Sequence, residues 1–431
     1  MEILKIHNNP ERAEWAALTE RFTREEEEIT RQVTEILADV KSGGDRSLRE
    51  VTRRVEGRDP RTFEIPADVR AAAAALIPAA LKEALAAAKA NIETFHRAQL
   101  PPEVDIETMP GVRCVQRAVP IRRVGLYIPG GKAPLFSTVL MLAVPARVAG
   151  CEQIVLCTPP QKDGSVAPAV LYAASIAGVR RIFKAGGAQA IGAMAYGTQS
   201  IPRVDKIFGP GNQYVTAAKQ QVASSSVAID MTAGPSEVLV MADSTAVPAF
   251  VAADLLSQAE HGTDSQTVLL TPSRGLAEQV AREVERQLAA LPRRQTAALA
   301  LENSRIVVLD SPDEMIEMSN AYAPEHLILS VEDPWAVAER ITAAGSVFLG
   351  NYTPESAGDY ASGTNHTLPT GGWARAYSGV NTDSFLRKIT YQELSRKGLA
   401  TLSPTVIAMA EAEGLGAHAA AVRVRMKGGV L

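Results

Sequence analysis

Residues 124–157, VGLYIPGGKAPLFSTVLMLAVPARVAGCEQIVLC, decide the fold class of this chain. Two short apolar runs, 124–128 and 154–157, flank a longer apolar segment, 137–149, that has the length of a helix. Short apolar runs bounded by glycine and proline predict buried strands, and a helix between two such strands is the usual crossover of a parallel sheet. The stretch therefore predicts a strand–helix–strand unit.

The same alternation continues toward the C-terminus. Further strands are predicted at 181–183, 206–208, 237–241, 267–270, 305–309, 327–330 and 346–349. Helices are predicted at 166–177, 188–196, 248–260 and 276–291, and helical patterns also cover 10–55, 67–98 and most of 390–431. Residues 351–380 are rich in Gly, Thr, Ser and Asn and predict a functional loop. The fold class is therefore α/β, with two successive, incomplete Rossmann-like parallel-sheet domains plus helical terminal segments.

Composition and charge exclude several classes of function. The 431 residues are 46% hydrophobic and 21% charged, which suits a soluble core, and the net charge of −4 provides no basic surface for nucleic acid or membrane. The N-terminus is charged from its second residue and has no apolar core long enough for a signal peptide, and the longest apolar stretches of the chain fall short of a membrane span. Three cysteines cannot form a disulfide framework. We therefore expect a cytoplasmic protein.

Only six histidines occur, and four of them lie in polar clusters that packing does not require. The clusters are Gln258 with His261, Glu325 with His326, Asp359 with His366, and Glu413 with His418. Imidazole beside carboxylate is typical of divalent-metal sites and of general acid–base catalysis. The clusters therefore indicate an enzyme that depends on a metal.

Two clusters suit a metal, although each also has a purely structural interpretation. Gln258 and His261 are three apart at the end of a predicted helix, so one face would present both as ligands. His261 equally suits a helix C-terminus as a cation. Asp359 offers a hard oxygen ligand for zinc or manganese, or caps a turn.

The other clusters leave similar alternatives. Glu325 and His326 lie at the entrance of a predicted strand and suit an acid–base pair or a salt bridge on the surface. Glu413 and His418, five apart on a predicted helix, fit solvated residues. The glycine-rich turns at 128–131 and 186–192 do not match the dinucleotide fingerprint, so the strand–helix context permits a dinucleotide without demonstrating one.

Taken together and in order, the motifs resemble one family, the histidinol dehydrogenases. The strings that carry the resemblance are VGLYIPGGKAPLFSTVLMLAVPARVAGC, GGAQAIGAMAYGT, VDKIFGPGNQYV, AGPSEVLV, DLLSQAEHG, NAYAPEHL, GDYASGTNHTLPTGG and EGLGAHAAAVRVR. They cover the chain from roughly residue 30 to the C-terminus. The resemblance implies a four-electron oxidation of L-histidinol through L-histidinal to L-histidine with two NAD⁺, by a homodimer with shared active sites and one Zn²⁺ per subunit.

The resemblance also implies roles for individual residues. The zinc ligands would be Gln258, His261, Asp359 and, from the partner subunit, His418. Glu325 and His326 would be the acid–base pair. The substrate would contact the four zinc ligands and His326, and in addition Ser236, His366 and Glu413. NAD⁺ would contact Tyr127, Gln189 and Asn212.

The implied domain order is discontinuous. A helical segment, 1–22, would precede a first α/β domain, 23–126 with 237–381, that carries the zinc and catalytic residues. Residues 127–236 would form a second α/β domain on the NAD side, and the helical tail 382–431 would reach the partner subunit.

Two other functions compete with this one. A paralogous zinc- and NAD-dependent dehydrogenase could act on another polar alcohol, as the sulfopropanediol dehydrogenases do. Glu413 and His418 favour histidinol, because both are expected where an imidazolyl amino alcohol binds. A non-catalytic, zinc-stabilised dimer that binds nucleotide is disfavoured, because such a protein has no need of the intact Glu325–His326 pair.

Overall fold

The computed structural model describes the chain except for residues 1–3, 22–25, 131–133, 232–233 and 429–431. The chain forms two compact units. Unit 1 consists of Met1–Gln99 and Arg122–Ser384, and unit 2 of Leu100–Ile121 and Phe385–Leu431.

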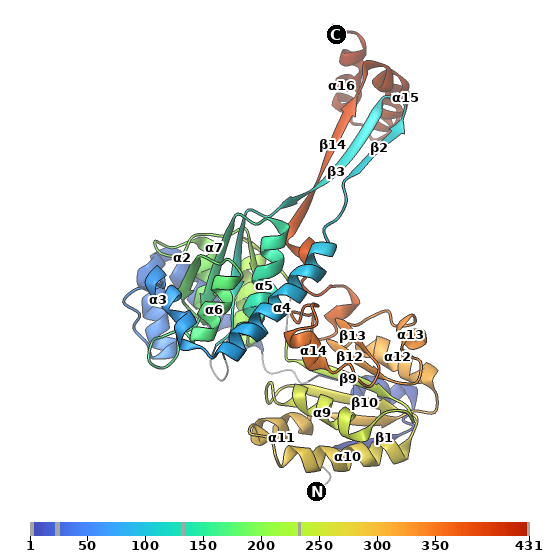
Figure 1. The fold of residues 1–431 in the computed structure, drawn as a ribbon. Coiled ribbons are helices and arrows are strands. Elements are labelled where there is room, and N and C mark those ends of the chain that lie inside the picture. Colours follow the sequence, from blue (N-terminus) through green and yellow to red (C-terminus); the bar gives the residue numbers. More distant parts are fainter. Residues whose placement is uncertain (1–3, 22–25, 131–133, 232–233, 429–431) are drawn as a thin grey trace. The chain divides into compact units, whose positions relative to one another are not determined.

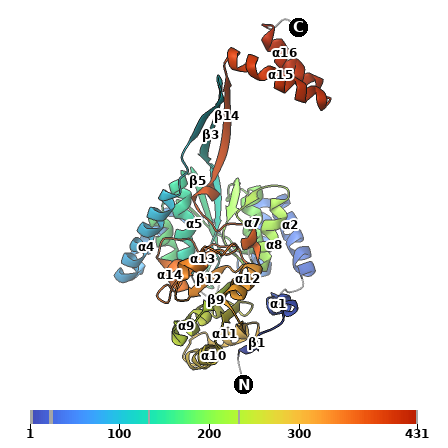
Figure 2. The same ribbon diagram turned by 90° about the vertical axis from the view of Figure 1, so that its right-hand side faces the viewer.

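Unit 1 contains a parallel sheet of five strands in the order β6-β5-β4-β7-β8. Its strands are β4 (Arg123–Tyr127), β5 (Gln153–Thr158), β6 (Arg181–Lys184), β7 (Lys206–Phe208) and β8 (Ala228–Ile229). Helices α5 (Phe136–Ala149) and α6 (Pro168–Ile176) pack together on one face, and α7 (Gly187–Tyr196) and α8 (Gln213–Ala223) on the other (Figures 1 and 2). The loops after β4 and β7 diverge, which is where open parallel sheets bind ligands.

The helices of the N-terminal region also pack on this sheet. Helix α2 (Glu26–Glu56) is interrupted at Gly44, which has φ +56°, and lies against α7 and α8. Beyond α3 (Ala67–Ala72) and η2 (Ala73–Leu76), α4 (Ala79–Ala98) packs on α5. The predicted domain order places 23–126 with 237–381, whereas the apolar face of α2 shares a core with the five-stranded sheet. The domain boundaries themselves stay a prediction.

Unit 1 also contains a parallel sheet of six strands in the order β1-β11-β10-β9-β12-β13. Its strands are β1 (Lys5–Asn8), β9 (Glu237–Ala242), β10 (Gln266–Thr271), β11 (Arg305–Val308), β12 (His326–Ser330) and β13 (Ser346–Leu349). Successive residues of β9 enter different cores, Val238 on one face and Leu239 on the other, as the two-residue period of a strand requires.

Helices cover both faces of this sheet. Helices α9 (Pro248–Ala259), α10 (Arg274–Leu288) and α11 (Arg294–Glu302) pack on one face. The other face is covered by α1 (Trp15–Leu18), α12 (Pro312–Tyr322) and α13 (Pro334–Ala338). After β13, the polar loop contains α14 (Glu355–Tyr360) and the 3-10 turn η3 (Trp373–Arg375). Two other 3-10 turns are η1 (Arg12–Glu14), which precedes α1, and η4 (Thr382–Phe385), which precedes β14. The predicted α/β fold with two parallel sheets is confirmed.

Unit 2 is an antiparallel sheet of three strands followed by two helices (Figure 1). The strands, in the order β14-β3-β2, are β2 (Val104–Met109), β3 (Val112–Pro120) and β14 (Leu386–Leu394). Helices α15 (Arg396–Ala412) and α16 (Gly416–Met426) pack against each other. Within the predicted helical tail, 382–431, helices occupy 396–412 and 416–426, whereas 386–394 form β14. The antiparallel sheet is not predicted from the sequence.

Among the described residues, no single helix has the length and apolar composition needed to cross a membrane. One sharply bent pair, 67–76 with 79–98, meets the length and composition requirement only when its two helices are taken together.

Candidate metal and acid–base site

The site lies where β9 and β12 begin. Glu237 is the first residue of β9 and His326 the first of β12, and these neighbouring parallel strands pair His326 with Val238. Because the strands run side by side in the same direction, their first residues meet at one edge of the sheet. Glu325 precedes β12 directly, and His261 lies in the turn between α9 and β10.

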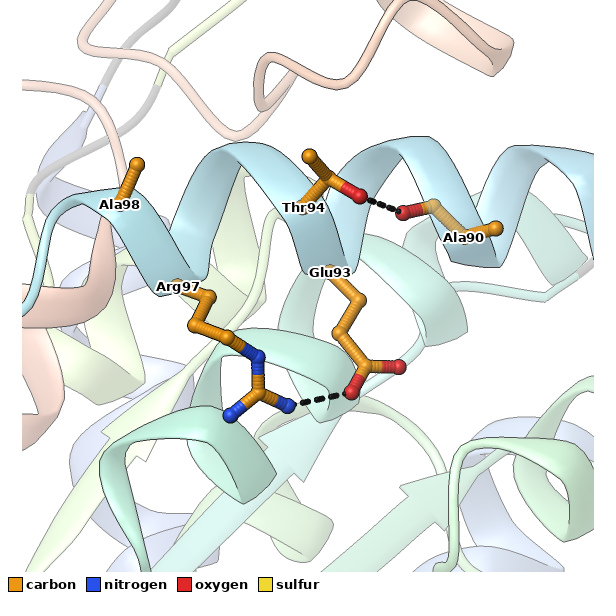
Figure 3. Close-up of a pocket in the computed structure, with 5 residues that line it drawn as sticks. All are labelled: Ala90, Glu93, Thr94, Arg97 and Ala98. Carbon is orange, nitrogen blue, oxygen red and sulfur yellow. Dashed lines mark hydrogen bonds and ion pairs between the residues drawn. The ribbon is translucent and has the colours of Figure 1, made fainter.

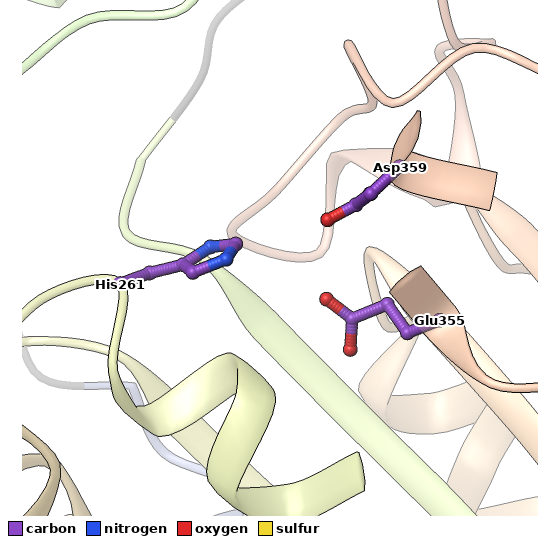
Figure 4. A group of neighbouring side chains, drawn as sticks. All are labelled: His261, Glu355 and Asp359. Carbon is purple, nitrogen blue, oxygen red and sulfur yellow. The ribbon is translucent and has the colours of Figure 1, made fainter. Parts of the chain in front are cut away.

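A candidate metal group forms where that turn approaches α14. His261, Glu355 and Asp359 each offer one ligand atom, and the three atoms lie within 4.8 Å of one another (Figure 4). Imidazole nitrogen and carboxylate oxygen are the donors that zinc binds. The Glu355 side chain is buried whereas His261 is exposed, so the group is open on the histidine side. These residues therefore fit a divalent cation.

Gln258 is fully buried beside the same group. In the orientation that satisfies its hydrogen bonds, its amide nitrogen donates to the Glu355 carboxylate and its oxygen accepts from the Glu237 main-chain nitrogen at 2.9 Å. The structure thus brings three predicted ligands, Gln258, His261 and Asp359, around Glu355, which is not among the residues predicted from the sequence. The fourth, His418, is an exposed residue of α16 in unit 2.

Main-chain groups of Glu237 hold the predicted acid–base pair. The Glu237 nitrogen donates to Glu325 Oε2 at 2.9 Å, and the Glu237 oxygen lies 3.1 Å from His326 Nδ1. A carbonyl can only accept, so Nδ1 carries a proton and Nε2 is the nitrogen left for proton transfer. His326 Nε2 lies 3.7 Å from Asp359 Oδ1 and hydrogen-bonds to none of the described residues.

Burial and charge shift the protonation of this cluster. Burial raises the pKa of Glu325 to about 8 and that of Glu355 to about 8. Burial alone would lower the pKa of His326, but the neighbouring carboxylates, Glu355 first, raise it to about 10. Without a cation, the cluster therefore holds protons near neutral pH. A bound divalent cation favours ionised carboxylates and a neutral imidazole.

A cavity of about 50 Å³ borders the acid–base pair. It is lined from the five-stranded sheet side by Gly209 and Pro210, and from the other side by the predicted residues Ser236, Glu325 and His366. His366 is fixed there, because its Nε2 lies 3.1 Å from Thr138 Oγ1 and its Nδ1 lies 2.8 Å from the Asp359 main-chain oxygen. The cavity therefore joins the carboxyl edge of one sheet to the amino edge of the other.

The three predicted NAD contacts lie along the carboxyl edge of the five-stranded sheet. Tyr127 ends β4, and its hydroxyl accepts a hydrogen bond from the Gly187 nitrogen at 3.0 Å. Gln189 is 1% exposed and donates to Glu56 Oε1 at 2.9 Å, so its amide is engaged within the protein. Asn212 caps α8 by accepting from the nitrogens of residues 214 and 215.

A larger hollow of about 560 Å³ runs beside α4 (Figure 3). It is lined by Ala90, Glu93, Thr94, Arg97 and Ala98. Its two charged side chains, Glu93 and Arg97, pair with each other at 2.6 Å. The hollow contains none of the predicted site residues, so we assign the chemistry to the smaller cavity.

Comparisons with known proteins agree with the family that the sequence motifs resemble. The sequence profile described as Histidinol dehydrogenase matches residues 19–426. Histidinol dehydrogenase from Bacteroides thetaiotaomicron is 56% identical over 424 residues, which span 98% of this chain and 99% of that protein. The enzyme of the same name from Escherichia coli O6:H1 is 54% identical, over 93% of this chain and 92% of its own. The crystal structure of histidinol dehydrogenase from Elizabethkingia anophelis superposes with a TM-score of 0.97 at 52% identity, covering 99% of both chains.

Proposed function

The chain belongs to the histidinol dehydrogenase family, and from this premise we propose that it oxidises L-histidinol through L-histidinal to L-histidine while reducing two NAD⁺. The enzyme thereby serves histidine biosynthesis. The observation that carries the proposal is the position of His326: its Nε2 faces Asp359 of the metal group, and Glu325 lies beside it at the cavity. We place the enzyme in the cytoplasm, with a small-molecule substrate and neither nucleic acid nor membrane as a partner.

The metal would be Zn²⁺, one per subunit, held by Gln258, His261, Asp359 and the partner subunit's His418 in a homodimer. The imidazole of His261 and the carboxylate of Asp359, both in the candidate metal group, support this assignment, and the exposed His261 leaves the group accessible to a further ligand from outside. When bound, zinc supplies positive charge that binds and orients the imidazole and amine of the substrate.

The acid–base pair divides the proton transfers. His326 takes the hydroxyl proton through Nε2 while a hydride leaves the carbinol carbon for NAD⁺, giving the aldehyde. Glu325 removes a proton from the water that adds to this aldehyde. The hydrated aldehyde then loses a second hydride to a second NAD⁺, and His326 again accepts the hydroxyl proton. The product carboxylate, two NADH and the released protons balance the reaction.

Other side chains bind the reactants. Ser236, His366 and Glu413 would contact the substrate, and the first two line the cavity next to Glu325. Tyr127, Gln189 and Asn212 would contact NAD⁺. Tyr127 and Asn212 border the diverging loops after β4 and β7, which supports their assignment, whereas Gln189 follows the edge strand β6 at the same carboxyl edge.

The deciding experiment measures NADH and histidine together, using purified zinc-loaded protein with L-histidinol. Two NADH per histidine support the proposed reaction. If zinc and NAD⁺ bind but histidinol is not turned over, the substrate assignment is wrong, and other polar alcohols become the candidates.

A further inference from the structure

A buried ion pair lies directly behind the acid–base pair. The Arg21 guanidinium binds the Glu237 carboxylate through two hydrogen bonds, Nε to Oε1 at 2.6 Å and Nη2 to Oε2 at 2.9 Å. The Glu237 side chain is 3% exposed and that of Arg21 is 21% exposed. Parallel double hydrogen bonds between guanidinium and carboxylate fix the relative orientation of both groups.

The same two side chains connect several segments of unit 1. Arg21 Nη2 donates to the Tyr322 main-chain oxygen at 2.7 Å, and the guanidinium lies over the Tyr322 ring at 4.0 Å. The Gly371 nitrogen donates to Glu237 Oε1 at 2.8 Å. The carboxylate of Glu237 is therefore bound to the N-terminal segment and to the loop that follows His366, while Arg21 also binds the end of α12.

Glu237 uses its main chain for a different purpose. Its nitrogen donates to Glu325 and its oxygen accepts from His326 Nδ1. One residue therefore orients both members of the acid–base pair and selects the Nδ1–H tautomer of His326. A shift of this residue by a fraction of an ångström would misplace both side chains at once, and such misplacements reduce catalytic rates.

We propose that Arg21 and Glu237 are positioning residues for the reaction: their ion pair fixes the first residue of β9 and, through its main chain, the orientation of Glu325 and the tautomer of His326. Neither side chain touches the reacting atoms. The inference rests on the proposed function for the roles of the acid–base pair. Stability alone does not account for the pair, because buried ion pairs seldom stabilise a fold more than apolar residues of similar size would.

The chain offers a matched control. Arg12 pairs with Glu317 at 2.5 Å and also lies in the N-terminal segment, but its side chain is 63% exposed and that of Glu317 is 49% exposed. Arg12→Gln therefore removes an ion pair from the same segment without altering the residues behind β9. Its kcat should equal that of the wild type, since exposed pairs contribute little.

The test compares Arg21→Gln, Arg21→Lys and Glu237→Gln with Arg12→Gln. Each variant is measured for kcat, KM, zinc content, melting temperature and the pH profile of kcat. We expect Arg21→Gln and Glu237→Gln to bind zinc fully and to lose about 100-fold in kcat, with little change in KM. Arg21→Lys keeps the charge but loses the double hydrogen bond, so its kcat should lie between that of Arg21→Gln and that of the wild type. The pH profile should shift, because the hydrogen bond to His326 weakens.

Wild-type kcat and an unchanged pH profile in folded, zinc-loaded Arg21→Gln would overturn the proposal and leave the ion pair a purely structural role. If Arg21→Gln fails to fold, Arg21→Lys decides in the same way. A second readout needs no substrate: with only six histidines, nitrogen NMR of zinc-loaded ¹⁵N-histidine protein can report the tautomer of neutral His326, assigned through His326→Asn. A tautomer unchanged in Glu237→Gln contradicts the positioning role, whereas absent turnover in the wild type contradicts the proposed function instead.

Discussion

Glu325 and His326 are adjacent in the sequence and bind main-chain groups of the same residue, yet their surroundings differ. Glu325 lines the cavity, and without a bound cation burial raises its pKa to about 8, whereas a bound cation favours its ionised form. His326 points its Nε2 toward Asp359 of the metal group. These positions fit the proposed division of proton transfers, in which the carboxyl group serves water and the imidazole serves the substrate hydroxyl.

This difference predicts two distinct phenotypes. Glu325→Gln should still oxidise histidinol to histidinal but lose about 10²-fold or more in the oxidation of histidinal, because only that step needs activated water. His326→Asn should lose a comparable factor in both steps. Initial rates of NADH formation from each substrate test this, with zinc content measured as a control. Loss of histidinol oxidation in zinc-loaded Glu325→Gln would show that the division of roles is wrong.

At this scale, the sequence reveals some site residues and hides others. Gln258, His261 and the Glu325–His326 pair can be selected because imidazole beside amide or carboxylate is a recognisable chemical pattern. Glu355 lacks such a neighbour in the sequence, and its burial and its contact with Gln258 arise only when α14 packs against α9. Arg21 is equally hidden, since the residue that it binds lies 216 positions away.

The element that follows β7 depends on one glycine. Gly209 has φ +128°, and a Cβ atom there would lie 2.1 Å from the Tyr127 main-chain oxygen at the end of β4. Its nitrogen donates to Asp230 Oδ2 at 2.8 Å, and its oxygen accepts from Lys219 Nζ at 2.8 Å. The loop that follows β7 therefore has little freedom to move away from a methyl group added at Gly209.

We expect Gly209→Ala to destabilise the protein by about 2–4 kcal/mol and to raise the KM for NAD⁺, because the loop borders the expected dinucleotide site. The control is Gly164→Ala: Gly164 also has a positive φ, +81°, but its Cβ would meet no described atom within 4 Å. That variant should lose only about 1 kcal/mol, with NAD⁺ kinetics unchanged. Urea unfolding and NAD⁺ titrations measure both effects, and equal losses in the two variants would contradict this account.

The strands that can be predicted from the sequence are the buried ones. Strands such as β9 and β10 are buried along their whole length, so their apolar runs are visible in the sequence. Strands β2 and β14 are almost entirely exposed, so no buried apolar run marks them: β2 alternates apolar and polar residues over only four positions, 104–107, and β14 carries polar residues on both faces. The four-residue β1 contains no buried residue and is defined only by its pairing with β11.

The stability of the whole molecule should depend on pH when the metal is removed. The folded-state pKa of Glu325, about 8, exceeds its ordinary 4.5, so the folded protein retains a proton that the unfolded chain releases, and stability falls as pH rises through this window. The pKa of His326, raised from 6.5 to about 10, contributes stability that is complete below pH 6.5 and is lost as pH rises to 10. Both shifts have the same sign.

We therefore expect the melting temperature of chelator-treated protein to fall by several degrees between pH 6 and pH 9. Zinc-loaded protein should show a smaller decrease, because the cation binds the ionised carboxylates and neutral imidazole. Glu325→Gln should also reduce the decrease, since the amide does not titrate. Circular dichroism melts at both pH values measure the effect. A higher melting temperature at pH 9 than at pH 6 in the metal-free protein would contradict the assigned protonation.

The subunit that supplies His418 can be identified by mixing two defective proteins, His261→Asn and His418→Asn, each expected to bind zinc poorly and to turn over little substrate. If His418 completes the partner's site, a mixed dimer contains one site with both defects and one with none. Random exchange of equal amounts should then restore about a quarter of wild-type activity and zinc content, since half of the dimers are mixed and half of their sites are intact. If His418 instead acts within its own subunit, every site keeps one defect, and mixing restores nothing. Refolding each variant alone provides the control, and the absence of restoration in verified mixed dimers would exclude shared sites.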